Sequence, residues 1–162
     1  KTRVPQGTVS SNLTASANFS YNWCMSNIKK ILIIFSTAFI LNAIWENIHS
    51  LLYSNYMGDK ITEIILLKAT LADAFIIVAL SLPFLFISSF KQKSWFIIFL
   101  GFIVAIIIEW WGLGTERWIY NTYMPIIPYL SIGLTPTLQL GLLGYISLKI
   151  EKYITALLEK SN

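Results

Sequence analysis

The sequence predicts an all-α integral membrane protein: a bundle of four transmembrane helices with both termini in the cytoplasm. Two observations predict this class. Of the 162 residues, 56% are hydrophobic and only 12% are charged, whereas a soluble domain carries roughly 25% charged residues because its surface must be polar. In addition, four long segments contain no Lys, Arg, Asp or Glu: 31–45, 74–90, 94–108 and 118–148. This composition excludes a soluble enzyme, a disordered tail and a disulfide-stabilised secreted domain.

Residues 1–27 are predicted to form a polar leader, and residues 28–162 the four-helix transmembrane domain. The leader is rich in Ser and Thr and lacks the apolar core of about 7–15 residues that a secretory signal needs. Met25 begins a short polar stretch that is followed by two lysines and a long apolar run. One hypothesis is therefore that residues 1–24 are an upstream extension that does not belong to the natural protein.

Four segments are apolar over the roughly 20 residues that a membrane-spanning helix needs. They are 31–53, 62–87, 95–113 and 126–148. The second contains Pro83 near its far end. The fourth begins around Pro128 and contains Pro136, where we expect a kink because proline removes one helical donor.

The lysines and arginines that flank these segments predict the orientation, because positive charge gathers on the cytoplasmic side. One face carries seven of them: Lys29, Lys30, Lys91, Lys93, Lys149, Lys152 and Lys160. The other face carries only Lys60 and Arg117. Both termini are therefore expected inside, and we expect the chain in the cytoplasmic membrane of a prokaryote.

Three acids lie inside predicted spans: Glu46, Asp73 and Glu109. Each costs roughly 2.5–3.5 kcal/mol at the centre of a bilayer, which favours a function for them. The alternative is that they are neutral or paired, and only hold the bundle together.

Helical spacing relates these acids to other polar residues. Asn42, Glu46, His49 and Tyr53 follow one another at intervals of four, three and four residues, so they form one stripe along the first helix. From the rise of 1.5 Å per residue, Glu46 and Glu109 should lie within about 10 Å of the outer membrane face, and Gln139 about 20 Å deep.

We therefore predict one pocket in the outer half of the bilayer, covered by the loop 114–125. The predicted catalytic residues are Glu46, His49, Glu109 and Asp73. The other predicted pocket residues are Asn42, Tyr53, Trp110, Trp111, Glu116, Arg117 and Gln139. An alternative for the aromatic residues at this level is an interfacial belt, which needs no ligand.

A metal site is not predicted within one chain. Glu46-x-x-His49 is half of the di-iron carboxylate pattern, and His49 is the only histidine, so only a homodimer could supply the second pair. No cofactor is predicted.

Acid–base chemistry on a lipophilic isoprenoid or lipid substrate fits the residues best, because Glu46 and His49 can act as a coupled pair. The predicted partners are membrane lipids, a lipophilic small molecule and a second copy of the chain, and nucleic acid is not among them. A proton-coupled transporter remains open, with Gly141-x-x-Gly144 as a close-packing face. A non-catalytic membrane subunit also remains open.

Overall fold

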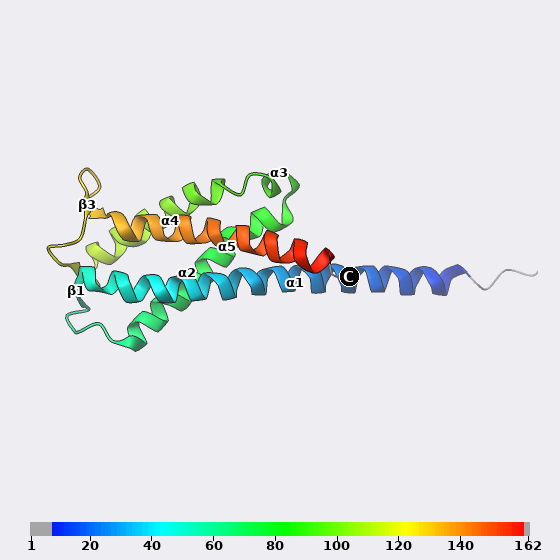
Figure 1. Cartoon of the computed structure of the whole chain (residues 1–162), viewed down its shortest axis with the longest axis horizontal. Helices are drawn as coiled ribbons and strands as arrows, with labels where there is room; N and C mark the ends of the chain where they lie inside the picture. The colour runs from blue at the N-terminus through cyan, green and yellow to red at the C-terminus, as the bar shows by residue number, and fades with distance from the viewer. Residues whose placement is uncertain (1–7, 161–162) are drawn as a thin grey trace, which may run out of the picture.

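The computed structural model describes the backbone of residues 8–160 and the side chains of residues 25–160. The described chain is mostly helical, as the sequence predicts. Four long helices pack against one another and alternate in direction (Figure 1): α1 (Thr8–His49), α2 (Glu63–Phe86), α4 (Phe96–Gly114) and α5 (Leu134–Lys160). The short helix α3 (Ser88–Lys91) joins α2 to α4.

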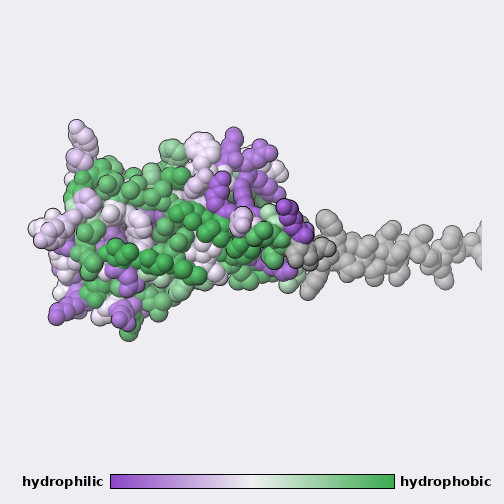
Figure 2. All heavy atoms as spheres, viewed as in Figure 1, coloured by the Kyte–Doolittle hydropathy of each residue, from purple (hydrophilic) through white to green (hydrophobic). Residues whose placement is uncertain are grey.

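Three of the described helices are long and apolar enough to cross a membrane: Met25–Leu52, Glu63–Phe86 and Phe96–Gly114. Large apolar side chains such as Leu32, Ile40 and Phe99 lie exposed on their outer faces, as expected where lipid tails cover a helix. Figure 2 shows hydrophobic residues over most of this side of the body, while hydrophilic residues gather near α3. These features are those of an integral membrane protein.

The predicted fourth span, 126–148, is wrong at its beginning. Residues 126–133 contain two short antiparallel strands, β3 (Ile126–Ile127) and β4 (Ile132–Gly133), and the helix begins only at Leu134. Pro125 and Pro128 explain this, because each lacks an N–H donor and keeps the preceding residue extended. Pro136 therefore falls in the first turn of α5, where a donor is not needed, and not in the middle of a span.

The first helix is longer than the predicted span 31–53. Its helical backbone begins at Thr8 and ends at His49, after which the chain forms a 3-10 turn (Ser50–Leu52) and the strand β1 (Tyr53–Tyr56). The hypothesis about residues 1–24 concerns side chains that lie outside the described residues.

One end of the bundle carries all four strands, and we call it the strand end; the opposite end, which carries α3, is the α3 end (Figure 1). At the strand end β1 pairs antiparallel with β2 (Trp118–Tyr120), with Tyr53 opposite Tyr120. The backbone N–H of Asn121 also donates to the carbonyl of Leu52 at 2.9 Å. The predicted cover, 114–125, is thus tied to the end of the first helix.

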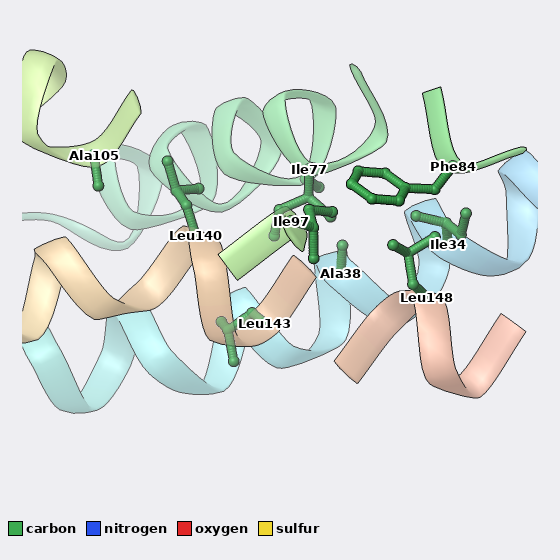
Figure 3. Packing of buried hydrophobic residues seen from close by; sticks show 10 residues of the cluster. Ile34, Ala38, Ile77, Phe84, Ile97, Ala105, Leu140, Leu143 and Leu148 are labelled. Carbon is green, nitrogen blue, oxygen red and sulfur yellow. The ribbon is translucent and has the colours of Figure 1, made fainter. Parts of the chain in front are cut away.

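The apolar core lies between the four long helices and extends from the middle of the bundle toward the α3 end. Figure 3 shows side chains from all four helices meeting there, among them Ile34, Ile77, Ile97 and Leu148. Helices α4 and α5 lie very close together at Gly101, where an added Cβ would lie 2.4 Å from the Cα of Gly141. The Gly141-x-x-Gly144 face therefore packs inside this chain.

Candidate functional site

A cavity of about 150 Å³ lies at the strand end of the bundle and is partly open to the outside. Every long helix contributes to its wall, together with β1 and the first residue of β2. Its polar and aromatic lining residues are Glu46, His49, Ser50, Tyr53, Tyr56, Asp73, Glu109, Trp118 and Gln139. The rest of the wall is apolar: Ile61, Ile65, Leu66, Ala69, Ala105, Ile108, Pro136 and Leu140.

The first polar cluster is organised around the side-chain amide of Gln139, which is 4% exposed. Its Nε2 atom donates to Glu46 Oε1 at 2.6 Å, to Asp73 Oδ2 at 2.7 Å and to Asn42 Oδ1 at 3.0 Å. The amide has two hydrogens for these three acceptors. Glu46 and Asp73 thus converge on one amide nitrogen, and two carboxyl groups held this close together repel each other unless one carries a proton.

The second polar cluster surrounds the carboxyl group of Glu109, which is 5% exposed. The hydroxyl of Tyr120 donates to its Oε2 atom, and the indole Nε1 of Trp118 donates to the same oxygen at 3.3 Å. Burial raises the pKa of Tyr120, and its bond to Glu109 raises that pKa further, so this phenol keeps its proton and remains a donor.

Two backbone features position these donors. The hydroxyl of Tyr120 accepts from the N–H of Gly133 at 2.8 Å, which links β2 to the beginning of α5. The indole of Trp118 lies directly over Gly112, where an added Cβ would come within 1.9 Å of the ring. Only glycine leaves room for the indole at this position, so Gly112 is a positioning residue for Trp118.

His49 also lines the cavity and is 5% exposed. Its ring meets the edge of Tyr53 with the centroids 4.9 Å apart. The Nε2 atom is buried and has no hydrogen-bond partner among the described residues. A buried polar atom without a partner costs about 1–3 kcal/mol, so this nitrogen is available to a bound molecule.

The structure brings Glu46, His49, Asp73, Glu109 and Gln139 together on one cavity. Tyr53 also lines it, and Asn42 lies behind it as a partner of Gln139. Gln139 is level with Glu46 rather than deeper in the bundle. The predicted depth was wrong because the helix begins at Leu134 and not near residue 126.

The structure places the other four predicted pocket residues outside the cavity. Trp110 is half exposed and donates to the carbonyl of Leu130 at 3.1 Å. Trp111 is also half exposed, with the guanidinium of Arg117 4.3 Å from its ring centroid. Successive residues of a helix turn by about 100°, so neither tryptophan can share the face of Glu109. Glu116 follows the end of α4 with a φ of 54° and is exposed.

Trp118 and Tyr120, whose side chains bond Glu109, are not among the predicted pocket residues. Both belong to a segment that reads as an interfacial aromatic belt. Their spacing of two is a signal, because alternate residues of a strand point to the same face. That signal identifies a strand only once the partner strand, 53–56, is known.

Within the described residues, no group of three or more His, Cys, Asp and Glu side chains is arranged to hold a metal ion. The cavity can instead accept hydrogen bonds, through its carboxyl groups and His49, and can hold an apolar body against its other wall. No protein-family model, curated protein or solved structure matches the chain.

Proposed function

We propose that the cavity carries out acid–base chemistry on a lipophilic isoprenoid or lipid substrate that enters from the side of the membrane. One observation carries the proposal: three carboxyl groups and a histidine nitrogen without a partner among the described residues converge on a cavity that also has eight apolar lining residues. Three acids inside a bilayer protein are costly, and simple packing needs none of them.

Each polar group has a role in this proposal. Glu46 and Asp73 share a proton and act as the acid, and Gln139 holds them in place. His49 accepts a proton through its free Nε2 atom. Glu109, held by Tyr120 and Trp118, supplies negative charge beside the reacting group. Delivery of a proton to one atom of the substrate and removal from another gives an isomerisation or a cyclisation; in a hydration, a water molecule adds to the protonated substrate and gives up the proton that is removed.

The apolar core supports an enzyme over a proton-coupled transporter. Between these polar residues and the α3 end, the described part of the bundle is filled by packed residues such as Ala38, Ile77 and Leu143. The buried hydroxyl of Ser81 donates to a carbonyl of its own helix, and that of Ser147 does the same. A transported proton needs a polar path to the α3 end, and these side chains do not offer one.

The membrane placement belongs to the same proposal. We place α5 as a fourth spanning helix, with the strand end outside and the lysine-rich α3 end in the cytoplasm, following the positive-inside rule. The cavity then lies in the outer half of the cytoplasmic membrane of a prokaryote. A leader over residues 1–27 would lie on the cytoplasmic side.

A hydrogen-exchange experiment tests the chemistry without knowledge of the substrate. The full chain is reconstituted in vesicles of a total membrane lipid extract in D2O, and mass spectrometry follows deuterium in carbon-bound positions of the lipids. We expect incorporation that depends on the protein. Glu46→Gln should reduce its rate by about 10²–10⁴-fold, the usual contribution of a general acid.

Glu63→Gln is the matched control, because Glu63 is exposed on α2 and does not line the cavity. It should leave the rate unchanged. Folded wild-type protein that gives no exchange and no lipid conversion contradicts the proposal. Proton flux through the same vesicles, lost in Glu46→Gln, would assign the cavity to transport.

A further inference from the structure

The Glu46–Asp73 pair has few hydrogen-bond donors around it, although the hydroxyls of Ser50, Tyr53 and Tyr56 also line the cavity. The donors of Tyr120 and Trp118 are already taken by Glu109, and the two hydrogens of the Gln139 amide face three acceptors. What remains for a bound molecule is acceptor capacity, on the Glu46–Asp73 pair. A ligand that satisfies this wall must bring several donors of its own.

The charges around the cavity have the same sign. The acids are Glu46 on α1, Asp73 on α2 and Glu109 on α4. None of the described residues that line the cavity is Lys or Arg. Any negative charge on this wall is therefore without a positive partner from the chain itself, and a low dielectric strengthens its attraction for a cation.

His49 gives an independent indication of a ligand. Its side chain is 5% exposed and lines the cavity, and its Nε2 atom has no hydrogen-bond partner among the described residues. An apolar ligand would leave this atom unsatisfied. A donor group at the polar side of the cavity would satisfy both His49 and the neighbouring carboxyl pair.

We propose that the substrate class of this cavity is a lipophilic amine, held as its ammonium form by Glu46, Asp73 and the Nε2 atom of His49. This inference rests on the proposed function and names the substrate that the same site takes. An ammonium group brings two or three donors and a positive charge, while an alcohol brings one donor and no charge. The aromatic ring of Tyr53, which lies against His49, adds to the attraction for a cation.

The size of the cavity limits the polar end of this amine. A cavity of about 150 Å³ can hold a molecule the size of benzene, so a compact ring or short branch fits beside the ammonium group. A longer apolar chain must leave through the open side of the cavity.

The test compares benzylamine, which is cationic at neutral pH, with benzyl alcohol, its neutral counterpart of nearly equal size. Binding to the purified full chain in detergent is measured by titration calorimetry. We expect benzylamine to bind at least about tenfold more tightly than benzyl alcohol, because a hydrogen bond to a charged group is worth more than a neutral one. Glu46→Gln and Asp73→Asn should each weaken benzylamine binding by a similar factor.

Glu63→Gln is again the control and should bind benzylamine as the wild type does, while size-exclusion profiles show which variants are folded. Equal binding of the two probes overturns the inference, and so does folded wild type that does not bind benzylamine. Benzylamine binding that survives in folded Glu46→Gln and Asp73→Asn overturns it too. Deuterium exchange into lipids is measured in a separate experiment. If the protein catalyses that exchange but does not prefer benzylamine to benzyl alcohol, this inference is wrong and the proposed function stands.

Discussion

The close approach of α4 and α5 gives a prediction whose size follows from the structure. In Gly101→Ala the new Cβ would lie 2.4 Å from the Cα of Gly141 and 2.8 Å from the backbone carbon of Leu140. Ordinary contact begins at 3.4 Å, so the two helices must separate by about 1 Å at this point. Backbone atoms cannot rotate away as a side chain can.

Overpacking of this kind costs about 1–3 kcal/mol, and backbone contacts belong to the upper part of that range. Alanine also favours the helix by about 1 kcal/mol over glycine. The expected net effect is a loss of about 2 kcal/mol in the free energy of unfolding. Titration with denaturing detergent, followed by circular dichroism of the purified full chain, measures it.

Gly144→Ala is the matched control, because Gly144 lies three residues after Gly141 on α5. Its Cβ would lie 3.2 Å from the Cδ1 atom of Ile97, the flexible end of a side chain that can move by a few tenths of an ångström, and its other contacts, at 3.6 and 3.8 Å, are ordinary. We expect this variant within about 1 kcal/mol of the wild type. If Gly101→Ala proves as stable as Gly144→Ala, the reasoning about the helix contact is wrong.

Three further predictions concern the site and the membrane. Gln139→Leu removes the donor shared by two carboxyl groups and should lower the free energy of unfolding by about 2–6 kcal/mol, since each buried acceptor left unpaired costs about 1–3 kcal/mol. Gly112→Ala should displace the indole above it, leave the helices folded by circular dichroism and abolish deuterium exchange into lipids. In a Cys24→Ser background, Ser89→Cys and Tyr129→Cys should react with a membrane-impermeant thiol reagent from opposite sides of the membrane.

Each of these has an outcome that contradicts it. Wild-type stability in Gln139→Leu would mean that the amide does not hold the carboxyl pair. Full exchange activity in Gly112→Ala would remove Trp118 from the site. Labelling of both cysteines from the same side would overturn the proposed topology.

The polar stripe on the first helix could be predicted because it depends only on the helical repeat. Glu46 and His49 share a face in any α-helix that contains them, and a carboxyl group avoids lipid, so both had to face protein. Glu109 could be matched to them since its helix runs in the same direction. This part of the site is local geometry combined with one energetic rule.

The remaining parts depend on contacts between segments far apart in the sequence. The pairing of Tyr53 with Tyr120 joins two loops, and no local pattern around either tyrosine specifies the other. The depth of Gln139 depended on where the last helix begins, and hydropathy does not distinguish an apolar hairpin from an apolar helix. Prolines 125 and 128 were the available signal for that boundary.

The position of Gln139 on the last helix has a consequence for biosynthesis. Glu46 and Asp73 are made 93 and 66 residues before the amide that holds them. At a synthesis rate of about 5–20 residues per second, Glu46 waits roughly 5–20 s for this partner. During that interval the first two helices enter the membrane with their carboxyl groups unsatisfied by Gln139. A ribosome that stalls before α5 therefore leaves a membrane intermediate with exposed acids, which is the form that quality-control proteases and insertion chaperones would meet.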